Sequence, residues 1–204
     1  MAYDETGALR GRCAPAPQPP DHPEDSSGDP ESVAREICLT LLASRARTRA
    51  ELATSLARRG VPEEAVDRVL SRFAEVGLVD DRAFAEAFVA SRHAGQGLAR
   101  RALATELRHR GVDPGTAATA LDRLDEQAEL ATARALVRRR SGVDQGQETR
   151  VWTRRAVGML VRKGYSPGMA YQAVRAELAA EGVEVTDEMY VDTEGWDPVD
   201  VETE

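Results

Sequence analysis

Apolar side chains recur every three or four residues through most of the chain, a spacing that predicts amphipathic helices. The clearest case is residues 81–92, where Phe84, Ala87 and Phe88 fall on one helix face. We expect both phenylalanine rings to anchor a buried core. Alternation typical of strands is missing from the sequence, so the predicted fold class is all-α.

Polar residues and glycines mark the ends of these helices. Asp80 and Asp81 precede the phenylalanine-bearing helix, one as its N-cap and the other at the positive end of its dipole. Capping explains both carboxylates without a catalytic role. Gly95 and Gly97 interrupt the pattern, and the helix that follows ends at Gly111, a residue typical of left-handed helix ends. The stretch therefore predicts a helix hairpin.

A six-residue pattern occurs three times, as LARRGV, LRHRGV and LVRKGY, with its glycines 51 and then 53 residues apart. A proline follows each copy and is expected to open the next helix. A further helix is predicted ahead of each copy, at residues 32–44 (with Ser32 as its cap), 81–92 and 126–139. These features predict an elongated, curved array of three three-helix repeats. The expected repeats span residues 32–79, 80–125 and 126–182, the third with an extra polar loop at 141–148.

Residues 77–112 also resemble the signature of a known family. The resemblance is carried by Gly77, Leu78, Asp80, Asp81, Phe84, Ala85, Phe88, Val89 and Arg92, then by Glu106, Leu107, Arg110, Gly111 and Val112. This pattern is similar to that of the RecX family, bacterial regulators of the recombinase RecA, and looser similarity extends over residues 32–182. The resemblance makes Asp80, Asp81, Phe84, Phe88 and Gly111 the residues of a structural signature.

The resemblance implies a regulatory protein that binds RecA and its single-stranded DNA filament and mainly inhibits the recombinase. The implied setting is DNA recombination, DNA repair and the SOS response. The array would lie in the helical groove of the filament, and duplex DNA is a second candidate ligand. The alternative function is a general DNA-binding helical repeat protein that does not depend on RecA. A helical scaffold without a nucleic-acid partner is a third class.

Charge is unevenly distributed along the chain. Residues 1–31, with six prolines, carry a net charge of −5, residues 32–181 carry +6, and residues 182–204 carry −9. We predict a disordered Pro-rich arm at residues 1–31 and an acidic tail at 183–204. The basic body indicates an anionic partner, most simply nucleic acid. The acidic ends either compete for that surface or only keep the protein soluble.

Arginines supply the candidate binding residues, which are Arg100, Arg101, Arg108, Arg155 and Arg162. Arg101 and Arg108 are seven residues apart on one predicted helix face, as are Arg155 and Arg162. Basic residues in a last helical turn complement the helix dipole, which gives a structural alternative for Arg58-Arg59, His109-Arg110 and Arg162-Lys163. Arg162 belongs to both groups. Because the chain has 26 arginines and one lysine, arginine identity alone does not separate them.

Other chemistry finds little support. The stretch GQGLAR at residues 95–100 lacks the third glycine and the preceding strand of a dinucleotide site. His22, His93 and His109 show no metal-ligand spacing with Cys13 or Cys38, so neither cofactor nor metal is expected. Trp152 is interpreted as packing, with base stacking as the alternative. We expect a non-enzymatic, cytoplasmic monomer with no membrane partner.

Overall fold

The computed structural model describes residues 29–140 and 149–182. Within these ranges the chain forms helices and no strand, which confirms the predicted all-α class. The helices are α1 (Pro30–Ser44), α2 (Arg49–Ala57), α3 (Glu63–Glu75), α4 (Asp81–Gln96), α5 (Arg100–His109), α6 (Pro114–Leu121), α7 (Glu126–Arg140), α8 (Thr149–Arg162) and α9 (Pro167–Ala180). The predicted arm, the polar loop at 141–148 and the acidic tail lie outside the described residues, apart from residues 29–31.

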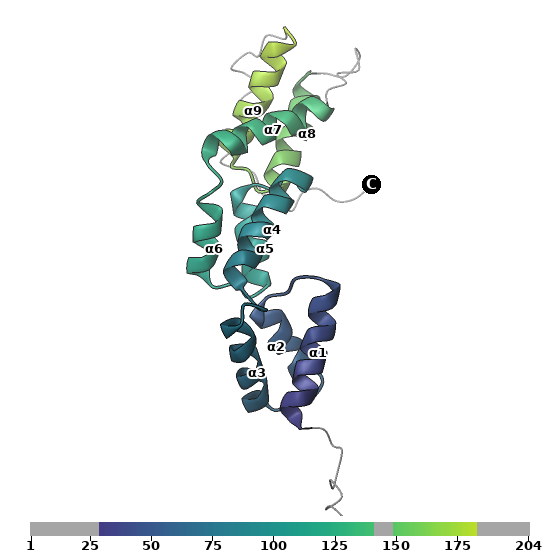
Figure 1. Cartoon of the computed structure of the whole chain (residues 1–204). Coiled ribbons are helices and arrows are strands. Elements are labelled where there is room, and N and C mark those ends of the chain that lie inside the picture. Colours follow the sequence, from purple (N-terminus) through teal and green to yellow (C-terminus); the bar gives the residue numbers. More distant parts are fainter. Residues whose placement is uncertain (1–28, 141–148, 183–204) are drawn as a thin grey trace, which may run out of the picture.

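The helices are arranged as three successive triples along an elongated body, from α1–α3 at one end to α7–α9 at the other (Figure 1). Within the first triple all three helices pack on one another, and the same holds for α4–α6. In the third triple, α9 packs against both α7 and α8. This is the helical repeat array that the sequence predicts. The repeat boundaries at residues 79/80 and 125/126 remain our proposal.

Each triple has its own buried cluster of side chains. The first cluster includes Leu52, Leu56 and Leu70, and the second includes Leu103 and Leu107. These leucines are fully buried. Burying each of them contributes about 1.5–3 kcal/mol relative to exposure. Because the apolar area is divided into three small cores, each triple also depends on its neighbour.

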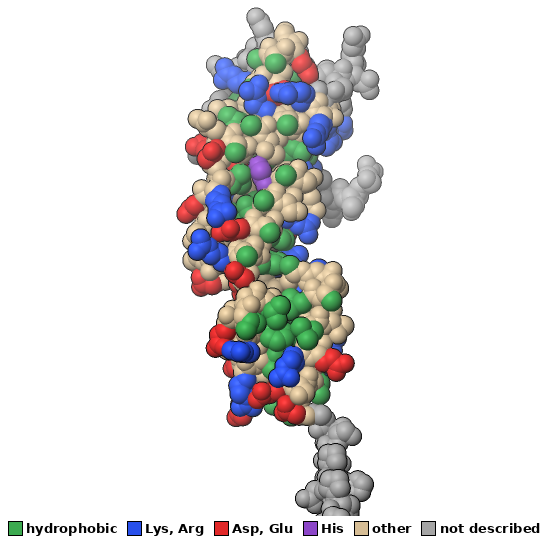
Figure 2. All heavy atoms as spheres, in the orientation of Figure 1, with side chains coloured by type: hydrophobic (Ala, Val, Ile, Leu, Met, Phe, Trp, Pro, Cys, Tyr) green, Lys and Arg blue, Asp and Glu red, His purple; other side chains and the backbone are tan. Residues whose placement is uncertain are grey.

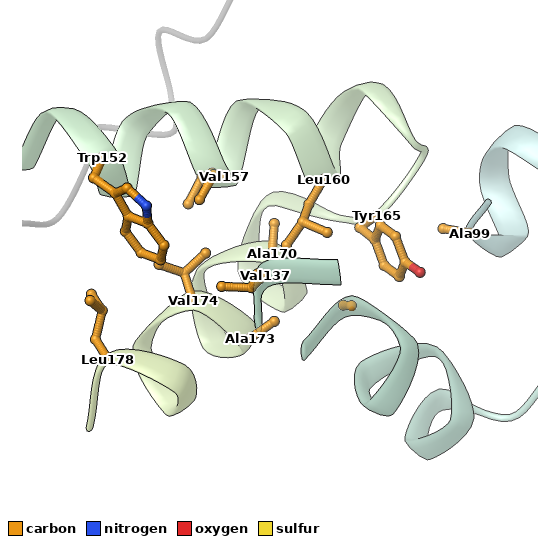
Figure 3. Packing of buried hydrophobic residues seen from close by; sticks show 12 residues of the cluster. Ala99, Val137, Trp152, Val157, Leu160, Tyr165, Ala170, Ala173, Val174 and Leu178 are labelled. Atoms are coloured by element: carbon orange, nitrogen blue, oxygen red, sulfur yellow. The ribbon is translucent and has the colours of Figure 1, made fainter. Parts of the chain in front are cut away.

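The third cluster joins α7, α8 and α9 and reaches into the second triple. Figure 3 shows Trp152, Val157 and Leu160 directed toward the residues of α9, and the ring of Tyr165 beside Ala99. Trp152 is only 5% exposed, which confirms its interpretation as a packing residue. The Tyr165 hydroxyl donates a hydrogen bond of 3.1 Å to the carbonyl oxygen of Gly97. Burial raises the pKa of Tyr165 to about 12, so the phenol stays a donor at physiological pH.

Two helix ends differ from the sequence expectation. The N-cap of α1 is Asp29 rather than Ser32, because the carboxylate of Asp29 accepts the backbone N–H of Glu31 and Pro30 occupies the first helical position. The second difference is at the C-terminal end of α4, where Gly95 lies inside the helix. Gly97 alone ends that helix, in the left-handed region with φ of 63°.

Asp80 and Asp81 have different partners. One oxygen of Asp80 accepts the N–H groups of Arg82 and Ala83 at 2.9 Å, so Asp80 is the N-cap of α4 as predicted. Asp81 instead accepts the backbone N–H of Arg49 at 2.8 Å and thereby caps α2 of the preceding triple. Asp81 therefore lies at the positive end of the α4 dipole, as expected, and in addition caps a helix of the neighbouring triple.

The same kind of contact joins the second and third triples. The N–H of Arg100, the first residue of α5, donates to a carboxylate oxygen of Glu129 at 2.7 Å. At both junctions a carboxylate from the first helix of one triple thus caps the second helix of the triple before it. A side chain supplied by the next repeat satisfies one of the free N–H groups at a helix N-terminus and fixes the two repeats in register.

Candidate nucleic-acid interface

A basic recess lies at the junction of the first two triples. It has a volume of about 400 Å³ and is lined by Arg45, Arg47, Ala50, Glu51, Thr54, Ser55, Arg58, Arg108, His109, Arg110 and Gly111. We call it the basic recess. Its arginines come from the connection between α1 and α2, from the end of α2 and from the end of α5. The junction therefore gathers cations from three places in the sequence.

Glu51 organises one side of the basic recess. Its two carboxylate oxygens accept hydrogen bonds from Arg45 at 3.0 Å and from Arg110 at 2.7 Å. One carboxylate thus holds two guanidinium groups in place, and the three groups together keep a net positive charge. Arg47 is also anchored, because its Nε donates to the carbonyl oxygen of Leu41 at 3.3 Å.

Arg58 and Arg108 complete the basic recess and are exposed. Neither forms an ion pair within residues 29–140 and 149–182. Exposed arginines with five donors each are suited to phosphate oxygens. An anion entering the basic recess meets two such side chains beside the three anchored ones, and His109 lies next to them.

The predicted binding arginines separate into two groups. The guanidinium of Arg100 donates to the carbonyl oxygen of Leu121 at 2.8 Å and pairs with Asp122 at 2.6 Å. It ties α5 to the end of α6, which favours a structural role for Arg100, and its assignment as a binding residue stays a prediction. Arg101, Arg108, Arg155 and Arg162 are exposed and have no ion pair among the described residues. Of these four, only Arg108 lines the basic recess.

Phe84 and Phe88 were expected to be core anchors, and the structure corrects this. Both rings are only partly buried and pack against the edge of the second core. Their centroids are 5.8 Å apart in a stacked arrangement. The guanidinium groups of Arg92 and Arg110 lie 5.3 and 4.9 Å from the Phe88 centroid, within cation–π range. The rings face an open groove rather than the interior.

The sequence interpretation missed several residues of the basic recess. It assigned Arg58 and His109 to helix-dipole effects and gave Arg45 and Arg47 no role. The signal available in the sequence was a basic pair in the short connection at residues 45–48. Its relation to Arg108, more than sixty residues away, depends on how the triples dock.

Basic side chains also gather over the third triple in the view of Figure 2. Some of the arginines of the third triple form ion pairs within the protein. Arg134 and Arg138 hold the carboxylate of Glu177, at 2.7 and 2.9 Å. That carboxylate is nearly buried, and the hydrogen bonds from Arg138 and then from Arg134 lower its pKa. These two cations stabilise the contact between α7 and α9.

Other kinds of site find no support among the described residues. No group of His, Cys, Asp and Glu in residues 29–140 and 149–182 is arranged to hold a metal ion. His93 contacts the carbonyl oxygen of Leu98 at 2.9 Å and the hydroxyl of Thr132 at 2.8 Å, so it joins α4 to α7. Cys38 is fully buried, which raises the pKa of its thiol. Over the same ranges, no helix has the length and apolar character of a membrane span.

Comparison with known proteins agrees with this architecture. A family model described as the first three-helix domain of RecX matches residues 34–73, and one described as the second three-helix domain of RecX matches residues 80–121. The regulatory protein RecX of Thermobifida fusca is 57% identical over 168 residues, covering 81% of this chain and 91% of that protein. The regulatory protein RecX of Streptomyces coelicolor is 53% identical over 154 residues, covering 76% of this chain and 82% of that protein.

The crystal structure of RecX from Lactobacillus salivarius superimposes with a TM-score of 0.67 at 19% identity. It covers 74% of this chain and 98% of that one. At this identity the likeness concerns the fold alone.

Proposed function

Because this chain belongs to the RecX family of regulatory proteins, we propose that it binds RecA and its single-stranded DNA filament and mainly inhibits the recombinase. The protein acts by binding, without catalysis or cofactor, in the cytoplasm where RecA and its DNA are found. Its setting is recombination, repair and the SOS response. One observation supports this proposal most directly, namely the convergence of Arg58 and Arg108 at the first junction.

The basic recess fits a segment of a phosphate backbone. Arg58 and Arg108 contact phosphate oxygens. Arg45 and Arg110 add positive potential, and because Glu51 already holds their side chains in place, DNA binding does not have to immobilise them. Arg101 on α5 and Arg155 and Arg162 on α8 are further exposed cations of the array. An elongated array of repeats presents these cations over a long distance, which suits a filament better than a compact ligand. The protein acts as a monomer on successive filament subunits.

The DNA-dependent ATPase activity of RecA tests this function. We expect inhibition when the chain is present well below one copy per recombinase subunit, since one bound array affects several subunits. The alternative, a DNA-binding protein that does not depend on RecA, predicts loss of activity only when the chain saturates the DNA. That second result would overturn the proposed filament mechanism.

Matched charge reversals test the basic recess. Arg58→Glu combined with Arg108→Glu should weaken binding to the filament and to single-stranded DNA. The slope of log affinity against log salt should also fall by about 0.7 for each phosphate that the variant no longer neutralises. The control is Arg35→Glu with Arg175→Glu, which changes the net charge equally at exposed positions outside the recess. Equal weakening by both pairs would mean that net charge, and not the basic recess, determines binding.

A further inference from the structure

An open groove of about 970 Å³ lies beside the basic recess, between the first two triples. Its apolar lining includes Leu42, Leu78, Phe84 and Phe88, and we call it the apolar groove. Leu78 is 51% exposed, although it is a large aliphatic side chain. Apolar side chains are also visible on the first triple near this junction in Figure 2. An exposed apolar surface of this kind marks an interaction site.

The rim of the apolar groove is basic. Arg45, Arg47, Arg92 and Arg110 line it, against a single carboxylate, that of Asp80. The Asp80 carboxylate is already engaged as the cap of α4. Three of the arginines, Arg45, Arg47 and Arg110, also line the basic recess, so the two depressions are adjacent and share these side chains. An occupant of the apolar groove must therefore combine negative charge with apolar side chains.

We propose that the apolar groove binds residues 183–204 of this same chain. This segment has nine acidic residues and no basic one, which complements the arginine rim. It also carries Met189, Tyr190 and Trp196, which suit the apolar lining. A nucleic-acid strand matches the charge and can stack bases on Phe84 and Phe88, but it leaves the aliphatic part of the lining, formed by Leu42 and Leu78, without an apolar partner. The acidic segment satisfies both requirements.

The segment is long enough to reach the apolar groove. Helix α9 has 14 residues and spans about 21 Å. Its N-terminal end follows Gly164, which contacts Ala102 near the start of α5. From there α5 covers about 12 Å to Arg110 at the edge of the groove. The 14 residues from Gly182 to Trp196 extend to about 48 Å, which exceeds this path.

Docking of this segment has a regulatory consequence, and that consequence rests on the proposed function. A tail in the apolar groove lies against the arginines shared with the basic recess, so DNA has to displace it. Because the tail is tethered, its effective concentration at the groove is high, and the competition is strongest at low salt. The apolar groove is thus an interaction surface that controls access to the basic recess.

Fluorescence of Trp196 in the full-length chain tests the docking without RecA or DNA. The chain has two tryptophans, and Trp152 is buried, so the difference between the parent protein and Trp196→Phe isolates the emission of Trp196. We expect acrylamide to quench Trp196 several-fold less efficiently in the parent than in Leu78→Glu, which places a negative charge in the apolar groove. The control is Leu39→Glu, at a side chain that is 47% exposed and outside the groove lining. Acrylamide should quench Trp196 in Leu39→Glu as inefficiently as in the parent.

Several outcomes would overturn the proposal. Equal quenching in the parent, Leu78→Glu and Leu39→Glu would show that Trp196 does not occupy the apolar groove. Shielding that appears only as protein concentration rises would identify a second copy as the occupant. Arg92→Glu provides an independent groove variant if Leu78→Glu lowers the unfolding midpoint, and it should also expose Trp196. Because the fluorescence experiment contains no RecA, its result on docking of the segment is independent of the ATPase result on the proposed function.

Discussion

The buried hydroxyl of Thr48 donates a hydrogen bond of 2.7 Å to the carbonyl oxygen of Arg110, 62 residues further along the chain. The same hydroxyl accepts the N–H of Glu51 and so caps α2. One small side chain therefore both starts a helix of the first triple and satisfies a free carbonyl at the end of α5 in the second. The register of the first junction depends on this contact.

Thr48→Val keeps the shape of the side chain and removes both hydrogen bonds. It should lower the free energy of unfolding by about 1–3 kcal/mol, because the N–H of Glu51 in the first turn of α2 loses its acceptor and the carbonyl oxygen of Arg110 at the junction loses its donor. Urea unfolding measures the change. Thr48→Ser, which retains the hydroxyl, is the control and should cost less. Equal destabilisation in both variants would assign the effect to packing of the methyl group instead.

The three repeat glycines offer an internal comparison of junction packing. All of them have positive φ, 75° at Gly60, 73° at Gly111 and 92° at Gly164. A Cβ at Gly60 meets nothing within 4 Å, whereas at Gly111 it meets the Cβ of Ala50 and at Gly164 it lies 2.6 Å from the Cβ and backbone nitrogen of Ala102. Alanine at Gly60 should cost about 1 kcal/mol from backbone conformation alone. Alanine at Gly111 or Gly164 should cost clearly more, because the junction has to open.

Thermal or urea unfolding of these three alanine variants checks the comparison. Equal destabilisation at all three positions would show that neighbouring triples adapt without cost, and that the close approach at the junctions contributes little to stability.

Phe88→Ala should be less damaging than its place in the sequence pattern indicates. A fully buried phenylalanine costs about 3–5 kcal/mol when truncated, but the Phe88 ring is half-buried, so we expect about 1–3 kcal/mol. Leu103→Ala removes a fully buried side chain from the same core and should cost about 2–5 kcal/mol. Urea unfolding of both variants ranks them. A larger destabilisation for Phe88→Ala than for Leu103→Ala would show that the Phe88 ring contributes to stability as a core residue.

Glu177 makes the stability of the third triple dependent on pH. Hydrogen bonds from Arg138 and Arg134 lower its folded-state pKa below the ordinary value of 4.5. Because the folded pKa is the lower one, this contribution is fully present above about pH 5 and disappears as the pH falls through the folded value. Glu177→Gln removes the ionisable group and should lower the free energy of unfolding by about 1–3 kcal/mol at pH 7.

Unfolding measured from pH 7 down to pH 3 separates this contribution from general acid destabilisation. The difference between the parent protein and Glu177→Gln should shrink as the pH falls. A difference that stays constant over this range would mean that the carboxylate contributes through its shape or neutral hydrogen bonding rather than through its charge.

The sequence by itself determined the helices, their approximate ends and their threefold repetition. These features depend on interactions within a few residues, such as apolar spacing, the Asp80 cap and the left-handed glycines at 60, 111 and 164. It also identified the family through residues 77–112. The two misplaced ends, at Ser32 and Gly95, are local choices between neighbouring candidates for the same role.

Only the tertiary structure decided which faces are covered and which arginines are free. An amphipathic helix in the sequence shows that one face is apolar, but the packing of the other helices determines whether a side chain on that face is enclosed, as for Leu103, or left partly open, as for Phe84 and Phe88. In the same way, Arg100 and Arg108 look equivalent in the sequence. Packing of α5 against α6 gives Arg100 a carboxylate from Asp122, whereas docking of the second repeat on the first brings Arg108 and Arg58 into the same recess. Both outcomes depend on tertiary contacts between residues whose separation along the chain carries no periodic signal.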